Sequence, residues 1–207
     1  MKRVILYGLG KFFQKYYQHI FSQYEVVGLS DREEGKVFAV LHAYPNHLFN
    51  TRAIKVHELK KEAENCDYIL ITAGNYGVLA KYLIKSLGIK ATKIKAYQFD
   101  TVGCMHFYGE HNEDAVICLL LIKYGIKPEE VTYLDIGSNN PINCNNSYCL
   151  YRLGASGCLI DPLEEFQYAS MVTRHRDSFI RAAVSDKTEE SPKFFWFIIL
   201  ILVSFFA

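Results

Sequence analysis

The chain has 207 residues and a formal net charge of +1, with 50% hydrophobic and 22% charged residues. Such values are typical of a globular protein with one large or two small domains, and no block of Lys and Arg indicates nucleic-acid binding. The first residues lack the apolar stretch of a signal peptide, so we expect a cytoplasmic location. The six cysteines form no C-x-x-C pair, so we expect neither a metal site nor a disulfide framework.

The first hundred residues alternate between strand-like and helix-like segments. Short apolar runs predict strands, and longer periodic segments predict helices; the strands are 4–7, 25–29, 67–72 and 93–97, and the helices are 11–22 and 76–87. Strands that alternate with helices favour a parallel sheet covered on both faces. We therefore predict a Rossmann-like accessory domain over residues 1–104.

A nucleotide-binding pattern is partly present in this first unit. Gly8 and Gly10 follow the first strand, and Asp31 follows the second strand about twenty residues later, as in a Rossmann nucleotide site. Phe13 stands where a third glycine is expected, so the pattern is incomplete. Two interpretations remain open: a nucleotide or nucleotide-sugar site, and a structural or substrate-presenting domain.

The alternation resumes after residue 105 and predicts a second α/β unit. Strands are expected at 131–136, 156–160 and 179–184, and helices at 115–124, 146–153 and 163–173. Asn112 or Asp114 is placed to cap the first of these helices. The fold class that we predict is α/β, with two Rossmann-like units built on parallel sheets.

Polar residues follow two successive strands of the second unit. Asp135, Gly137, Ser138 and Asn139 follow the first strand, and Asp161 ends the second. Ligands of open α/β sheets bind at the carboxyl ends of strands, where small residues allow close approach and an acid can accept from a ribose diol. Neither common phosphate-binding glycine pattern is complete. A nucleoside without phosphates, such as S-adenosylmethionine, therefore fits best.

The alternatives for these residues are structural. Asp135 could cap a turn, Gly137 could be a turn glycine, and Asn139 and Asn140 could form Asx-turns.

The second unit resembles an FkbM-type methyltransferase. The stretches DIGSNNP, NNSYCLY, RLGASG and LIDP occur in the order of that family, and GEHNEDAVI and RAAVSDKTEE resemble its first helix and third strand. The resemblance covers about residues 109–197. It departs from the family at Ser138, where Ala is usual, and at Asp161, where Glu is usual. A complete sheet of this family continues beyond the third strand.

The resemblance implies the N-terminal part of a class I methyltransferase fold over residues 105–197, and thus an incomplete domain. It implies S-adenosylmethionine as cofactor, transfer of its methyl group to a hydroxyl of a sugar or other small molecule, and an acceptor site that this chain does not complete. The implied cofactor contacts are Asp135, Gly137, Ser138, Asn139, Asp161 and Asp186. For Asp186, the residue pattern favours a solvated turn acid over a contact near the adenine. No catalytic base is indicated; His111 is the only histidine inside a motif, and Glu110 lies beside it.

The C-terminal residues break the pattern of strands and helices. Residues 194–207 carry no charge, but the stretch is shorter than a bilayer-spanning helix requires. It is also too uniformly apolar for an edge strand, so we expect residues 198–207 to lie outside the fold, as a frameshift would leave them. Membrane association through this tail is the weaker alternative. A binding module that lacks catalysis is the rival to the methyltransferase.

Overall fold

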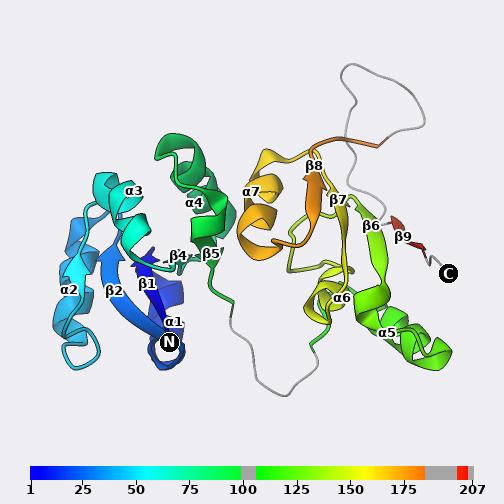
Figure 1. Ribbon diagram of the computed structural model, residues 1–207, viewed down its shortest axis with the longest axis horizontal. Coiled ribbons are helices and arrows are strands. Elements are labelled where there is room, and N and C mark those ends of the chain that lie inside the picture. The colour runs from blue at the N-terminus through cyan, green and yellow to red at the C-terminus, as the bar shows by residue number, and fades with distance from the viewer. Residues whose placement is uncertain (99–105, 185–199, 205–207) are drawn as a thin grey trace. The chain divides into compact units, whose positions relative to one another are not determined.

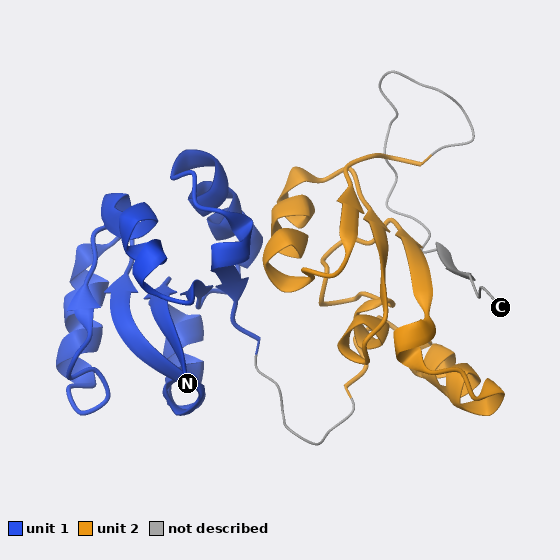
Figure 2. Cartoon of the chain, viewed as in Figure 1, with its two compact units in different colours: residues 1–102 blue, residues 103–207 orange. Residues whose placement is uncertain are grey.

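The computed structural model describes residues 1–98, 106–184 and 200–204. The chain forms two compact units, unit 1 with residues 1–102 and unit 2 with residues 103–207 (Figure 2). Each unit is an α/β fold with its own sheet, as the strand and helix periodicity predicts.

Unit 1 has a five-stranded sheet in the order β3-β2-β1-β4-β5, in which every neighbouring pair is parallel. The strands are β1 (Lys2–Tyr7), β2 (Tyr24–Ser30), β3 (Arg52–Ala53), β4 (Tyr68–Ile71) and β5 (Ile94–Ala96). Along the chain, β2 and β3 are added on one side of β1, and β4 and β5 are then added on its other side. This reversal beside β1 is the switch point at which doubly wound sheets bind ligands.

Helices connect these parallel strands and lie on both sides of the sheet (Figure 1). They are α1 (Lys11–Gln23), α2 (Glu34–Ala43), α3 (Leu59–Glu62) and α4 (Tyr76–Lys81), with 3-10 turns at Val56–Glu58, Ala63–Asn65 and Ala91–Lys93 and a π-helical turn at Tyr82–Ser86. Val4 and Leu6 of β1 share one core with Phe13 and Ile20 of α1. Because residues on both faces of β1 are buried, the strand reads as a continuous apolar run.

Residues 32–66 hold elements that the periodicity did not predict, namely α2, β3 and α3. Two of them are very short, since β3 has two residues and α3 has four. Segments of this length carry too little periodic signal to be recognised without their neighbours.

Unit 2 has the strand order β8-β7-β6-β9. Its strands are β6 (Thr132–Ile136), β7 (Ser156–Ile160), β8 (Ser178–Ile180) and β9 (Leu200–Ser204), and its helices are α5 (Glu113–Tyr124), the 3-10 turn Pro128–Glu130, α6 (Tyr148–Arg152) and α7 (Glu164–Thr173). The first three strands are parallel, whereas β9 is antiparallel to β6. The second sheet is therefore mixed at its β9 edge. The third predicted strand, 179–184, ends earlier than expected, at Ile180.

The prediction that the tail is too apolar for an edge strand is wrong for residues 200–204. These residues pair with the whole of β6, from Leu200 opposite Ile136 to Ser204 opposite Thr132. Without β9, that edge of β6 would present a row of unpaired backbone N–H and C=O groups. The backbone of an apolar segment supplies hydrogen-bond partners for these groups as well as the backbone of a polar segment does. Asp186 and residues 194–199 lie outside the described part of the chain.

A buried guanidinium holds the parallel strands of unit 2 to the segment after β6. Arg174 is 1% exposed and donates to Asp177, Tyr133, Ser147, Asn145 and the carbonyl of Pro141, at 2.5–3.2 Å. We call Arg174 and these side chains the Arg174 network. The Tyr133 hydroxyl also donates to Asp177 at 2.6 Å, and the other oxygen of Asp177 accepts the N–H of Gly157 on β7.

A buried charge is tolerated only when it is paired and its donors are satisfied. The Nε of Arg174 lies 2.6 Å from Asp177, and both side chains are fully buried. Burial also raises the pKa of Tyr133, so its phenol stays protonated and keeps donating. Removal of one member therefore leaves others unpaired inside the unit.

The change Tyr133→Phe tests this network. It removes one hydroxyl from the partners of Arg174 and Asp177, and we expect the free energy of unfolding of unit 2 to fall by about 1–3 kcal/mol. Urea-dependent hydrogen exchange of β6 and β7 peptides measures this loss. The matched control Tyr124→Phe removes a hydroxyl from a residue that is 65% exposed, and equal effects of the two changes would contradict the role of the network.

Candidate functional site

The loop after β1 is held by the acid after β2. One carboxylate oxygen of Asp31 accepts the N–H of Leu9 at 2.7 Å, and the other accepts the N–H of Glu33 at 3.0 Å. Gly8 has a φ of +94°, a conformation that side chains with a Cβ rarely adopt, and its N–H donates to the carbonyl of Ser30. The three residues predicted for a nucleotide, Gly8, Gly10 and Asp31, therefore belong to one small region at the carboxyl ends of β1 and β2.

Helix α1 begins immediately after this loop with an open N-terminus. Gly10 is its N-cap, no side chain among the described residues caps it, and its first turn has no acid. A Cβ added at Gly10 would meet nothing within 4 Å. The first backbone N–H groups of a helix have no partner inside the helix and favour anions. This end of unit 1 can thus receive a phosphate group.

Sequence reasoning overlooked Arg32, which follows Asp31 directly. Its guanidinium lies 4.4 Å from the centre of the Tyr82 ring. Burial raises the pKa of Tyr7, and the neighbouring Arg32 partly opposes that rise. A basic side chain directly after the acid of the second strand is a sequence signal for nucleotide binding, because an arginine near this position can donate hydrogen bonds to a phosphate on the ribose.

The same arrangement recurs in unit 2. One oxygen of Asp161 accepts the N–H of Asn139 at 3.0 Å, and the other accepts the N–H of Leu163 at 2.9 Å. Gly137 and Asn139 have positive φ values of 71° and 52°. The N–H groups of Gly137 and Ser138 both donate to the carbonyl of Ile160. The structure therefore brings the Asp135–Asn139 loop and Asp161 together, as the positions of these residues after neighbouring strands predict.

Asp135 points into unit 2. It is 1% exposed and accepts from the Ser147 hydroxyl at 2.6 Å and from the Asn145 amide at 3.3 Å. Burial raises the pKa of its carboxyl, and the hydrogen bond from Ser147 opposes that rise. Its immediate role is to anchor the asparagine-rich segment, and contact with a cofactor stays a prediction.

Two polar atoms in this loop region are buried and have no hydrogen-bond partner within the described residues, namely Ser138 Oγ and Asn146 Oδ1. Unsatisfied buried polar atoms are rare and call for a partner. By contrast, Asn140 Oδ1 accepts the N–H groups of Ile142 and Asn143 at 3.0 and 2.9 Å, which confirms the Asx-turn interpretation for Asn140. Asn146 was overlooked by sequence reasoning because its burial arises only in the fold.

The residues before β6 have structural partners. Asp114 is fully buried and accepts the N–H groups of Tyr108 and Ala115, so it holds the preceding segment to the first turn of α5. Asn112 is the N-cap of α5, but its side chain makes no capping bond. His111 is exposed, and its Nδ1 lies 3.4 Å from Glu113.

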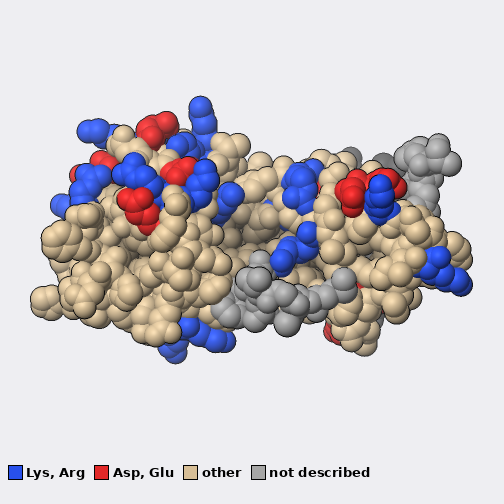
Figure 3. Space-filling model, turned by 60° about the horizontal axis from the view of Figure 1, so that its bottom comes forward, with Lys and Arg blue, Asp and Glu red and all other residues tan. Residues whose placement is uncertain are grey.

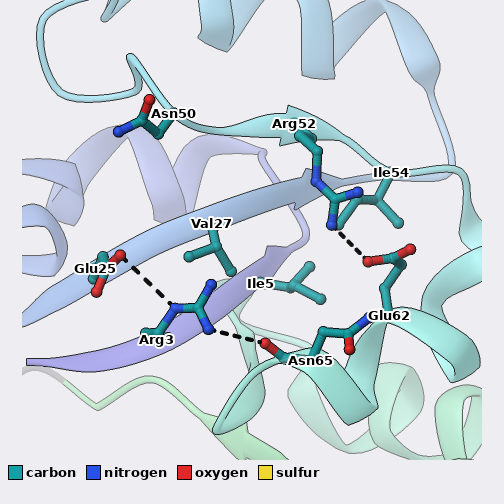
Figure 4. Close-up of a pocket in the computed structure, with 9 residues that line it drawn as sticks. All are labelled: Arg3, Ile5, Glu25, Val27, Asn50, Arg52, Ile54, Glu62 and Asn65. Carbon is teal, nitrogen blue, oxygen red and sulfur yellow. Dashed lines mark hydrogen bonds and ion pairs between the residues drawn. The ribbon is translucent and has the colours of Figure 1, made fainter.

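A pocket of unit 1 lies elsewhere, beside the first residues of β1 and β2 (Figure 4). It has a volume of about 150 Å³ and is lined by Arg3, Ile5, Glu25, Val27, Asn50, Arg52, Ile54, Glu62 and Asn65. Arg52 pairs with Glu62 at 2.6 Å, and Arg3 lies 3.8 Å from Glu25. Since these charges neutralise one another and ligands of such sheets bind at the opposite strand ends, we place the candidate sites at Gly8–Gly10 and after β6.

The charges on the surface of the described residues do not single out a further site. On the face that Figure 3 shows, basic and acidic side chains are interspersed over unit 1, and much of the remaining surface is uncharged. In the described ranges, no cluster of His, Cys, Asp and Glu is suited to hold a metal ion. No described helix has the length and apolar character needed to cross a membrane.

Comparison with known proteins leaves the family open. No family model matches the chain, and no curated protein matches it. Two crystal forms of the UDP-N-acetylglucosamine 3-dehydrogenase GnnA from Acidithiobacillus ferrooxidans are similar, with identities of 10% and 12%, TM-scores of 0.33 and 0.34, and coverage of 68% and 74% of this chain and of 47% and 55% of theirs. A proposed myo-inositol dehydrogenase from Sinorhizobium meliloti 1021 shows 14% identity, a TM-score of 0.34, and coverage of 68% of this chain and 47% of its own. The chain spans about half the length of these structures, and likeness at this level carries no argument about activity.

The matching roles of Asp31 and Asp161 can be tested reciprocally. In Asp161→Ala, the N–H groups of Asn139 and Leu163 lose their acceptor, and we expect their amide exchange to accelerate by roughly tenfold or more, since such a bond is worth about 1–3 kcal/mol. In Asp31→Ala, the amide exchange of Leu9 and Glu33 should accelerate in the same way. Each variant serves as the control for the other, because its substitution should leave amide exchange in the other unit unchanged. Unchanged exchange at these amides would contradict the role of the carboxylates in holding the loops.

Proposed function

We propose that unit 1 binds a nucleotide, either a dinucleotide or a nucleotide sugar. The observation that carries the proposal is the position of Asp31 against the Gly8–Gly10 loop, at the point where the strand order reverses. An open helix N-terminus, a loop glycine without neighbouring side chains and an acid after the second strand are the parts that such a site needs.

The ligand would lie along the carboxyl edge of β1 and β2. Its phosphates would face the first N–H groups of α1 beside Gly10. Its ribose would face Asp31, whose two oxygens each accept one backbone N–H and keep further lone pairs for a hydroxyl. Unit 1 would then serve as a binding module, and no residue of it is assigned a catalytic role.

The change Gly10→Ala should weaken nucleotide binding while unit 1 still folds. Gly10 has an ordinary negative φ and open space around its added Cβ, so an alanine fits, but its methyl group stands where the phosphates would approach. We expect a loss of about 1.5–3 kcal/mol in binding free energy, measured by calorimetry with NADH and with a UDP-sugar.

The control for this experiment is Gly35→Ala in α2, where an added Cβ also meets nothing within 4 Å. It should leave binding unchanged. If the wild-type chain binds neither ligand, or if both variants bind as the wild type does, unit 1 is not a nucleotide site of this kind.

A second candidate function concerns unit 2. Two observations support a site for S-adenosylmethionine at the loop after β6. One is the resemblance to FkbM-type methyltransferases, and the other is that the buried atoms Ser138 Oγ and Asn146 Oδ1 find no hydrogen-bond partner among the described residues. Helix α6 begins only at Tyr148, so the loop does not lead directly into a helix N-terminus that could receive a pyrophosphate. A nucleoside without phosphates fits that arrangement.

In this candidate function, the bound cofactor supplies an activated methyl group, and the acceptor is a hydroxyl of a sugar or other small molecule. The task of the chain is to bind and orient the donor. Asp161 would face the ribose, and Gly137 would let the backbone approach closely. Ser138 and Asn146 would contact the polar groups of the methionine portion.

The change Ser138→Ala tests the second candidate. Because Ser138 Oγ has no partner within the described residues, its removal should cost the fold little. If the hydroxyl contacts the ligand, the affinity for S-adenosylhomocysteine should fall by about 0.5–1.5 kcal/mol, as measured by calorimetry. The control is Ser170→Ala on α7, another buried hydroxyl that lacks a partner in the described chain. Equal affinity of wild type and Ser138→Ala would remove Ser138 from the site.

A further inference from the structure

Two cysteine thiols of unit 2 meet inside the protein. Cys118 of α5 and Cys149 of α6 have their sulfurs 3.7 Å apart. They are 5% and 2% exposed, and both are unoxidised thiols in the structure. A disulfide has a sulfur–sulfur distance of about 2.05 Å. Only a small movement of the two sulfurs toward each other is therefore needed to form the bond.

We propose that Cys118 and Cys149 are a redox pair, which a peroxide converts reversibly into a disulfide that ties α5 to α6. This inference does not rest on nucleotide or cofactor binding. It rests on the distance between the sulfurs and on their place in neighbouring helices.

The contact between the two thiols prepares one of them to react. Either sulfur could be the donor in this contact, and the thiol that keeps its proton can donate it to a thiolate on the other sulfur, which favours the ionised form. Thiolates are the nucleophiles toward peroxides.

The chemistry balances with hydrogen peroxide as the oxidant. The thiolate of one cysteine of the pair attacks one peroxide oxygen, the O–O bond breaks, and the hydroxide that leaves takes up a proton to become water. The resulting sulfenic acid is then attacked by the sulfur of the other cysteine, so the S–O bond breaks, the S–S bond forms, and a second water leaves with the thiol proton. Overall, two thiols are oxidised and one peroxide is reduced to two waters.

The crosslink would act on the segment between the two helices. It joins residues that are 31 positions apart and closes a loop that contains β6, the Gly137 turn and Ser147. Ser147 belongs to the Arg174 network and directly precedes α6. The disulfide should restrict this loop, and unit 2 should unfold at a higher temperature when oxidised than when reduced.

Peptide mapping of the whole chain after peroxide treatment tests the proposal. We expect a Cys118–Cys149 crosslinked product with a mass about 2 Da below that of the two reduced peptides together. Fragmentation must distinguish Cys118 from Cys104, and Cys149 from Cys144. Dithiothreitol should reverse the crosslink, and the thermal midpoint of unit 2 should fall back with it.

Cys66 is an internal control, because it is also buried but its sulfur contacts the carbonyl of Ala63 at 3.7 Å. It should stay reduced under the same treatment. The variant Cys118→Ser should lose the crosslink, whereas Cys158→Ser should retain it. A chain in which Cys118 goes to sulfinic acid without a crosslink, pairs with another cysteine or reacts no faster than Cys66 overturns the proposal.

Discussion

The carboxylates of Asp31 and Asp161 set the geometry on which both candidate sites depend. Each accepts a backbone N–H from the loop after the first strand of its unit and another from the residue two positions after itself. A hydrogen bond to an ionised acceptor is stronger than one between neutral groups. Each loop is therefore held at the carboxyl edge of its sheet without help from a ligand.

The segment that comes after each loop differs between the two units, and this difference separates the two proposed ligands. In unit 1 the loop leads straight into α1, so helix N–H groups lie beside Gly10. In unit 2 the chain continues through an asparagine-rich segment before α6 begins at Tyr148. A helix N-terminus attracts phosphates, whereas a segment rich in side-chain amides offers hydrogen bonds to a nucleoside without phosphates.

The asparagine-rich segment keeps its shape because a buried positive charge has to be satisfied. Arg174 donates to acceptors on β6, in the segment and on Asp177, and its charge would be costly to bury without them. The same network carries Ser147, which also bonds Asp135. The acid that the sequence predicts as a ligand contact, Asp135, is thus first a structural acceptor.

The α/β class, the two units, most strands and helices, and the acids and glycines at the carboxyl ends of strands could be predicted from the sequence, because these features depend on local periodicity and on turn residues. Other features depend on contacts between distant segments. Asp135 meets Ser147 and the Arg174 network only once β6, β7 and α7 have packed, so its burial has no local signal. Likewise, Leu200–Ser204 forms a strand because β6 has a free edge to pair with, and a free edge is a property of the sheet that no stretch of sequence contains.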